Sequence, residues 1–268
     1  MDFLTKIVEH KKVEVEERKK LVPESRLKAQ VKKAKHRVFM QSLSKPGPSG
    51  VNIIAEIKRA SPSKGVLCPD LDPKKYAKEY EKGGAAAISV LTDSTFFMAN
   101  QDDLKIVKNT STLPILRKDF TISSYQIYET AAMGADAALL IVRILSLKQL
   151  KDYLSLCDEL NLDALVEVNS EKELETASDA GARLIGINNR NLSSFDTDIN
   201  TAMRLSSLLN SQQTAVAASG IAERKDIEKS LSFGIFNFLI GESLVKADNP
   251  AKLLTSLMTP LKDGVLVK

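Results

Sequence analysis

The stretch DAALLIVRILSLKQLKDYLSLCDELNLDALVEV, residues 136–168, contains two short apolar runs separated by an amphipathic segment. The runs, at 136–142 and 162–168, lack the polar and apolar alternation of a half-exposed strand. Such runs are typical of strands buried on both faces of a parallel sheet. The segment at 146–160 has the length and pattern of a helix, so the stretch predicts one strand–helix–strand unit.

The same unit recurs from Val51 to the end of the chain. The further apolar runs are VNIIAEIK at 51, AAISVL at 86, LPILRKDF at 113, RLIGINN at 183, TAVAASG at 214 and FNFLIG at 236. Helices are predicted near residues 73–82, 101–109, 123–133, 146–160, 170–180, 198–209, 222–233 and 250–259, and Asp72 before Pro73 is a plausible helix cap. Eight strand–helix units in about 210 residues predict an α/β fold, a (β/α)₈ TIM barrel.

A doubly wound open sheet is the structural alternative to the barrel. That fold often carries a G-x-G-x-x-G turn after its first strand. Here the first run is followed by RASPSKG, residues 59–65, which does not match that pattern. The barrel is therefore the favoured fold.

The first 45 residues predict two helices in front of the barrel. Leu4, Val8 and Val15 lie near one helical face, and Pro23 begins a second helix in which apolar residues recur from Leu27 to Val38. SKPGPSG at residues 44–50 is then a connection rich in helix breakers. We expect one barrel domain over residues 1–268, of which 1–46 form an N-terminal helical extension.

Composition limits the location and partners of the chain. With 268 residues and 43% hydrophobic residues, it is long and apolar enough to fold, and no run approaches the roughly 20 apolar residues of a membrane helix. The N-terminus lacks the apolar core of a secretion signal, and two cysteines do not make a disulfide framework. We expect a cytoplasmic monomer without a membrane partner.

The positive charge of the chain is concentrated in its extension. Residues 1–45 hold 13 Lys and Arg against 6 Asp and Glu. No aromatic residues are interleaved with these lysines, as single-stranded nucleic acids would require for stacking. The basic segment is interpreted as a solvated helical face, and no nucleic-acid partner is expected.

The active site of such a barrel lies at the carboxyl ends of its strands, where several runs end in polar residues. Because residues two apart face the same side of a strand, Glu56 and Lys58 share a face. By the same rule Lys118, Glu167 and Asn188 each share the face of the apolar residue two positions before. If these faces point inward, two lysines, two glutamates and an asparagine converge at the barrel mouth. A buried ion-pair layer without catalytic duty is the alternative.

The chemistry of this set follows from its residue types. Both histidines, His10 and His36, lie in the extension, and the chain has no G-x-S-x-G, H-E-x-x-H or Walker A motif, so neither a metal nor a cofactor is expected. A lysine whose pKa is lowered toward neutrality can serve as general acid, and a glutamate whose pKa is raised can serve as base. A Schiff-base lysine, as in an aldolase, stays open as an alternative.

A phosphate site is predicted where (β/α)₈ enzymes often bind phosphate. Ser219 and Gly220 end the seventh run, and Gly241 ends the eighth. SPSKG from Ser61 adds two hydroxyls and a lysine after the first run. Together these residues favour a phosphorylated small molecule as substrate.

The segment IAEIKRASPSKG, residues 54–65, resembles the first-strand signature of the indole-3-glycerol phosphate synthase family. LPILRKDF, ALVEVN, GINNRNL, ASGI and LIGESL follow in that family's order, and the resemblance covers essentially the whole chain. It implies a monofunctional enzyme of tryptophan biosynthesis that converts carboxyphenylamino-deoxyribulose 5-phosphate to indole-3-glycerol phosphate. Carbon dioxide and water are lost, without cofactor or metal.

The resemblance also implies a role for each matching residue. Lys118 would be the general acid of ring closure, Glu167 an acid or base in dehydration, and Lys58, oriented by Glu56, the partner of the substrate carboxylate. Asn188 would hydrogen-bond the reacting hydroxyl or Lys118. The phosphate would be held by Ser61, Ser219, Gly220, Gly241, Glu242 and Ser243, and the aromatic end lined by Arg190, Leu192, Phe97 and Phe120.

One position departs from the family pattern. The family usually has glutamate directly before the serine of the seventh strand, whereas this chain reads VAASGI and has Ala218 there. Two other functions are therefore kept: a barrel that binds a phosphorylated ligand without efficient turnover, and another phosphosugar enzyme such as an isomerase or a Schiff-base aldolase.

Overall fold

The computed structural model describes residues 3–31, 36–191 and 195–260 of the chain. In these residues eight parallel strands close into a barrel in the order β1-β10-β9-β8-β7-β6-β5-β4, with β4 hydrogen-bonded back to β1. The strands are β1 (Asn52–Ile57), β4 (Ala87–Leu91), β5 (Ile115–Lys118), β6 (Ala137–Ile141), β7 (Asp163–Val168), β8 (Leu184–Asn188), β9 (Thr214–Ala218) and β10 (Asn237–Ile240). Each corresponds to one predicted apolar run, so the predicted (β/α)₈ barrel is confirmed.

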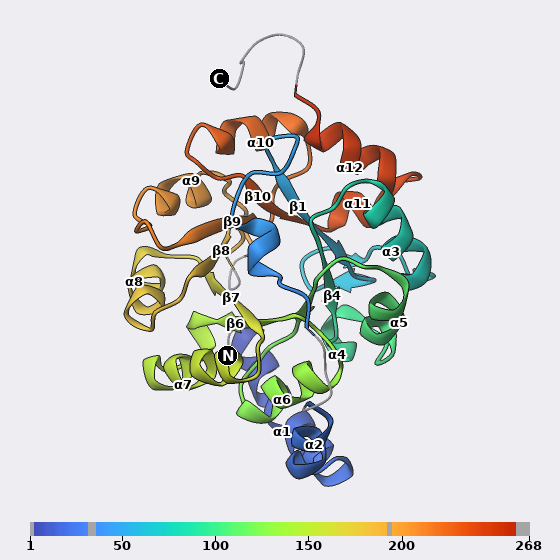
Figure 1. The fold of residues 1–268 in the computed structure, drawn as a ribbon, viewed down its shortest axis with the longest axis vertical. Helices are drawn as coiled ribbons and strands as arrows, with labels where there is room; N and C mark the ends of the chain where they lie inside the picture. Colours follow the sequence, from blue (N-terminus) through green and yellow to red (C-terminus); the bar gives the residue numbers. More distant parts are fainter. Residues whose placement is uncertain (1–2, 32–35, 192–194, 261–268) are drawn as a thin grey trace.

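Helices surround the strands (Figure 1). Those near the predicted ranges are α3 (Pro73–Lys82), α5 (Asp103–Thr110), α6 (Ser124–Ala132), α7 (Leu147–Glu159), α8 (Glu171–Asp179), α9 (Asn200–Ser206), α10 (Arg224–Leu231) and α12 (Pro250–Met258). The predicted cap is present, because the Asp72 side chain accepts a hydrogen bond from Lys74 N at the start of α3. Elements that were not predicted are the hairpin β2 (Ala60–Ser61) and β3 (Gly65–Val66), the 3₁₀ turn η2 (Val142–Ile144), and the short helices α4 (Ser94–Phe97) and α11 (Glu242–Lys246).

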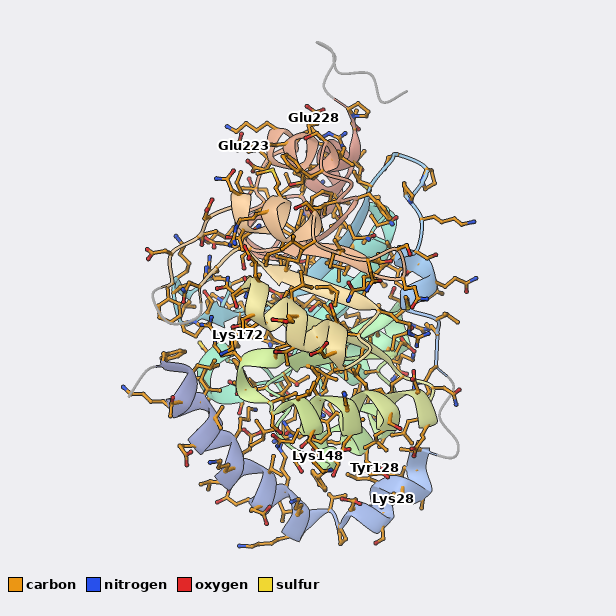
Figure 2. All side chains as sticks on the ribbon, turned by 90° about the vertical axis from the view of Figure 1, so that its left-hand side faces the viewer. Lys28, Tyr128, Lys148, Lys172, Glu223 and Glu228 are labelled. Atoms are coloured by element: carbon orange, nitrogen blue, oxygen red, sulfur yellow. The ribbon has the colours of Figure 1, made fainter. Side chains whose placement is uncertain are left out.

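The extension consists of α1 (Phe3–Leu21), α2 (Glu24–Val31) and the 3₁₀ turn η1 (Met40–Leu43). Helix α1 runs along the outside of the barrel (Figure 2). Helix α2 packs on α6, where Lys28 Nζ lies 4.7 Å from the centre of the Tyr128 ring. The extension is thus bound to one side of the barrel.

Two details of the predicted extension are wrong. The buried face of α1 is formed by Leu4, Ile7, Lys11 and Val15, whereas Val8 is only half-buried. The second helix ends at Val31 and does not continue to Val38, which is exposed and non-helical.

The barrel itself redirects the chain after α2. The backbone N–H of Arg37 donates to Asp136 Oδ1 at 2.6 Å, and a ring nitrogen of His36 lies 2.8 Å from Ala135 O. Asp136 lies beside the start of β6, so tertiary partners take the hydrogen bonds that a longer helix would have formed internally.

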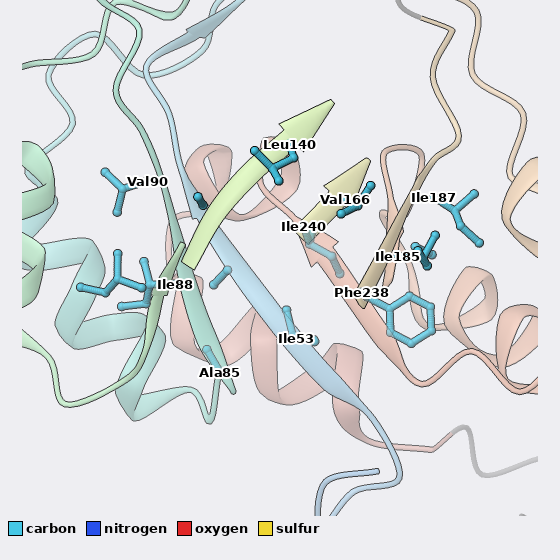
Figure 3. Packing of buried hydrophobic residues seen from close by; sticks show 14 of the residues in the cluster. Ile53, Ala85, Ile88, Val90, Leu140, Val166, Ile185, Ile187, Phe238 and Ile240 are labelled. Atoms are coloured by element: carbon cyan, nitrogen blue, oxygen red, sulfur yellow. The ribbon is translucent and has the colours of Figure 1, made fainter. Parts of the chain in front are cut away.

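The core has two parts because residues of each strand alternate between the barrel interior and the surrounding helices. The outer part packs strands against helices and includes Ile88, Leu140, Val166 and Phe238 (Figure 3). The inner part fills the barrel with side chains of every second residue, and Phe39 and Leu43 of the extension belong to it. Polar chemistry is therefore left to the strand ends.

Replacing Phe238 with alanine tests the outer core. Phe238 is fully buried, and removing a buried aromatic ring costs about 3–5 kcal/mol of the free energy of unfolding. We expect Phe238→Ala to lower the urea midpoint accordingly. Phe233→Ala is the matched control, because Phe233 is 51% exposed and its loss should change stability by less than about 0.5 kcal/mol. Equal effects of the two changes would contradict this description of the core.

Candidate active site

A cavity of about 470 Å³ opens at the carboxyl ends of the barrel strands. All described residues that were predicted as site residues lie in its lining: Glu56, Lys58, Ser61, Phe97, Lys118, Phe120, Glu167, Asn188, Arg190, Ser219, Gly220, Gly241, Glu242 and Ser243. Leu192, the remaining predicted residue, lies outside the described residues. The structure thus brings residues from six barrel strands and their loops to one place.

Two ion pairs form the polar centre of the cavity. Lys58 Nζ lies 2.7 Å from Glu56 Oε1, and Lys118 Nζ lies 3.1 Å from Glu167 Oε2. Asn188 Nδ2 donates to Glu167 Oε1 at 3.1 Å. Glu167 therefore holds a lysine with one carboxylate oxygen and an amide with the other.

The strands determine which side chains reach this centre. Lys118 and Glu167 occupy alternate positions after the inward-facing Leu116 and Leu165, which belong to the inner core. The alternation of a strand turns every second side chain to the same face. Four strands of a closed ring can therefore direct single charged groups to one point.

The charge pairs move the pKa values of two of these groups in the direction opposite to the sequence prediction. Burial alone would lower the pKa of Lys118, but Glu167 and Glu56 outweigh it and raise that pKa above its ordinary value. Burial would raise the pKa of Glu56, yet Lys58 and Lys118 outweigh it and lower that pKa. The expected neutral-range lysine is thus wrong for Lys118, because each charged form is stabilised by an opposite charge.

The glycine at the end of β10 makes room for one of the pairs. A Cβ atom at Gly241 would lie 2.6 Å from Glu56 Oε1 and 3.1 Å from Lys58 Nζ, which is closer than nonbonded atoms approach. A larger residue would therefore displace the Glu56–Lys58 pair.

The predicted phosphate residues gather at the β9 and β10 side of the cavity. Ser219 and Gly220 both have positive φ, 67° and 77°, which bends the chain sharply after β9. Within the described part of the chain, Ser243 Oγ is buried and has no hydrogen-bond partner. A buried hydroxyl of this kind is a suitable donor to an anionic ligand, because leaving it unpaired is unfavourable.

Apolar side chains form the opposite wall. The rings of Phe97 and Phe120 lie 6.1 Å apart, and those of Phe3 and Phe195 pack edge to face at 5.4 Å. Arg190 Nη1 donates to Ser63 Oγ at 2.6 Å across the cavity edge. An aromatic ligand group would find flat apolar partners on this side.

Sequence reasoning missed several residues of the lining. Phe3, Leu4 and Ile7 come from the extension, and Phe195 follows β8 at a distance from any strand end. Only the burial pattern of α1 carries a signal for the first three. Ser89 was also missed: it is fully buried, pairs in register with Glu56, and interrupts the apolar run AISVL.

Neither a metal centre nor a membrane helix is found where the structure can be described. Among residues 3–31, 36–191 and 195–260, no group of three or more histidine, cysteine, aspartate and glutamate side chains could hold a metal ion. In the same residues, no helix has the length and apolar character needed to cross a membrane.

Comparison with known proteins gives a consistent family. The family model described as indole-3-glycerol phosphate synthase matches residues 4–257. An indole-3-glycerol phosphate synthase of Desulfosudis oleivorans is 52% identical over 260 residues, covering 96% of this chain and 99% of the relative. One from Syntrophobacter fumaroxidans is 51% identical over 257 residues, covering 96% and 97%.

Solved structures with little sequence similarity share the fold alone. A thiamine phosphate pyrophosphorylase from Pyrococcus furiosus has a TM-score of 0.58 at 15% identity and covers 77% of this chain and 93% of its own. A mandelate oxidase has a TM-score of 0.59 at 14% identity, with coverages of 77% and 71%.

The charge pairing at Lys118 can be measured without any substrate. Glu167→Gln removes the largest contribution that raises the pKa of Lys118 and leaves the opposing effect of burial. We therefore expect that pKa to fall in the variant. Amine labelling with acetic anhydride across pH, followed by peptide mass spectrometry, reports it.

Glu16→Gln is the control for this measurement, because Glu16 is exposed and pairs with Lys19 on α1. It should leave the labelling profile of Lys118 unchanged. A Lys118 profile that is the same in Glu167→Gln as in the parent protein would contradict the pairing.

Proposed function

The chain belongs to the indole-3-glycerol phosphate synthase family, and from this premise we propose that it closes the indole ring by acid–base catalysis with paired lysines and glutamates. It is a decarboxylating lyase of tryptophan biosynthesis. The proposed substrate is carboxyphenylamino-deoxyribulose 5-phosphate, which becomes indole-3-glycerol phosphate with loss of one carbon dioxide and one water.

The observation that carries the proposal is the position of Lys118 between Glu167 and Glu56 inside the cavity. With its pKa raised, the amine is protonated at neutral pH and can donate a proton to a developing alkoxide. A Schiff-base nucleophile needs the free amine, which this environment disfavours. The geometry therefore favours general acid catalysis over an aldolase mechanism.

Ring closure is the first step of the proposed reaction. The aromatic carbon that carries the carboxylate attacks the ketone carbon, and the ketone oxygen takes a proton from the Lys118 ammonium. The bond to the carboxylate then breaks, carbon dioxide leaves, and its electron pair restores the aromatic ring. The product of this step carries a hydroxyl where the ketone was.

Dehydration is the second step. The hydroxyl leaves as water after receiving a proton, and the neighbouring carbon loses a proton to form the indole double bond. Glu167 lies in contact with both Lys118 and Asn188, so it can transfer a proton and be oriented by the amide at the same time. The sequence left two partners for Asn188; in the structure its amide nitrogen bonds Glu167.

The substrate carboxylate and phosphate have separate places in this proposal. Lys58 would pair with the carboxylate and is oriented by Glu56, 2.7 Å away. The phosphate would lie at the opposite side, against Ser61 and the backbone after β9 and β10. Gly220 fits there because its φ is positive and because a Cβ atom at this position would lie 2.7 Å from Thr197 Cγ2, which leaves no room for a side chain.

The aromatic wall would hold the aniline ring of the substrate. Phe97 and Phe120 offer apolar surfaces, and Arg190 lies at the edge of the wall. The domain limits, with residues 1–46 as an extension of one barrel domain, stay a prediction from the sequence. So do the monomeric state, the cytoplasmic location and the absence of cofactor and of nucleic-acid and membrane partners.

An assay of the purified protein tests the function. With carboxyphenylamino-deoxyribulose 5-phosphate and no added metal, we expect the fluorescence of an indole product to appear. Lys118→Ala should lower turnover by about 10²–10⁴-fold, the usual contribution of a general acid, with little change in the circular dichroism spectrum.

Three results would count against this function or its mechanism. Turnover near the parent value in a folded Lys118→Ala variant would remove the proposed acid. Trapping of a covalent Lys118–substrate adduct by borohydride would favour a Schiff base. No product from folded parent enzyme would favour a barrel that binds a phosphorylated ligand without turnover.

Ala218 is the position where the chain departs from its family's usual glutamate. Its side chain is 6% exposed and lines the cavity, and its register partner on β8 is Asn188. A carboxylate there would accept hydrogen bonds from substrate hydroxyls and add a negative charge near the lysines. We therefore expect Ala218→Glu to raise kcat/KM and to shift its pH profile.

Ala218→Gln separates charge from size. The amide fills the same volume without an ionisable group, so it should not shift the pH profile. If Ala218→Glu folds normally and kcat/KM stays unchanged or falls, the proposed deficit at this position is wrong.

A further inference from the structure

Helix α1 buries a lysine in a place where no apolar residue is needed. Lys11 is 1% exposed, and its ammonium lies 2.9 Å from Glu14, 2.9 Å from Asp93 and 2.8 Å from Asp119. Burial alone would lower the pKa of Lys11, but Asp119 and Asp93 outweigh it and raise that pKa. The group is therefore a fixed positive charge between α1 and the barrel.

Lys11 belongs to a closed cycle of ion pairs, here called the ionic ring. Its members alternate in sign and come from α1, from the end of β5 and from α6. In order they are Lys11, Asp119, Arg117, Glu129, Arg18 and Glu14, joined by N to O distances of 2.8, 3.0, 2.6, 3.0, 2.6 and 2.9 Å. Every member thus has an opposite charge on both sides.

The ionic ring holds the backbone on both sides of the proposed general acid. Arg117 and Asp119 are the chain neighbours of Lys118, and strand alternation turns their charged groups toward α1 and α6 while Lys118 points into the cavity. Both neighbours are buried, with 2% and 4% exposure. A shift of either would move the Lys118 backbone with it.

The same ring fixes part of the cavity wall. Leu4 and Ile7 lie on the buried face of α1 that also carries Lys11, and both line the cavity. Because the residues are three and four positions apart on one helix, the contact at Lys11 sets how closely this wall approaches the barrel. The extension therefore reaches the site through one rigid helix.

We propose that the ionic ring aligns helix α1 with the end of β5, and that Lys11 is a positioning residue which keeps Leu4 and Ile7 closed over Lys118. The inference rests on the proposed function, since it assigns this role in that reaction. A ring of buried charges is costly to desolvate and is weak evidence for stability, whereas its geometry is strongly directional. Alignment accounts for the ring better than stabilisation does.

Lys11→Met tests the proposal, because methionine has a similar length without the charge. We expect kcat/KM to fall about tenfold or more, since small displacements of a catalytic group are costly. Lys12→Met is the matched control: Lys12 is the next residue, its side chain is 59% exposed, and it forms an ion pair with the exposed Glu9. It should leave kcat/KM within about twofold, as expected for an exposed ion pair.

A double-mutant cycle with Leu4→Ala distinguishes positioning from a stabilising role alone. In the parent enzyme Leu4→Ala should raise KM severalfold, because it removes part of the wall. In Lys11→Met the wall is already displaced, so the same change should raise KM by less than about twofold. Additive effects on KM, or an unchanged kcat/KM in folded Lys11→Met, would overturn the proposal.

Two further measurements keep the test decisive. If Lys11→Met does not fold, the same cycle is run with Arg18→Met, which opens the ring at a half-buried member, and its additivity decides. Amide hydrogen exchange over residues 3–21 needs no substrate: it should speed up about tenfold in Lys11→Met and stay unchanged in Lys12→Met. Inactive parent enzyme would refute the proposed function, while unchanged exchange in Lys11→Met would refute the alignment itself.

Discussion

Closure of eight parallel strands into one ring is the constraint on which the rest of this structure depends. Each strand must turn alternate side chains into an interior that is too narrow for water, so most of that interior is filled by residues such as Leu116, Leu139 and Leu165. Charged groups can follow only where the strands end and the interior opens. Glu56, Lys118 and Glu167 lie at that level, and the ring brings them together although they are far apart in the sequence.

Charges at this level are kept in place by opposite charges. Lys118 faces Glu167 in the cavity, and its chain neighbours Arg117 and Asp119 face the extension on the outside of the strand. A buried ion needs a partner because its desolvation is costly. One short strand therefore carries two charge networks, one on each face. The reaction needs the inner network, and the outer one connects the barrel to helix α1.

The fold and most of the candidate site could be predicted from local patterns. Uninterrupted apolar runs identified the strands, and the polar residues two positions beyond an inward side chain identified Lys118, Glu167 and Asn188. The pKa directions could not be predicted, since they depend on distances across the barrel, such as 3.1 Å between Lys118 and Glu167. The wall residues Leu4 and Ile7 were missed because docking of the extension is a contact between distant segments. The end of α2 was misplaced for the same reason, since Asp136 binds the backbone of Arg37.

The sequence by itself determined the number of strand–helix units, the face of each strand that carries polar groups, and the family to which the motifs belong. These properties follow from backbone periodicity, which acts between residues close in the chain. Only the tertiary structure decided which charges pair, which lysine stays protonated, and how the extension closes the cavity. Electrostatic and packing energies depend on separations of a few ångströms between elements, and those separations exist only after the barrel has closed.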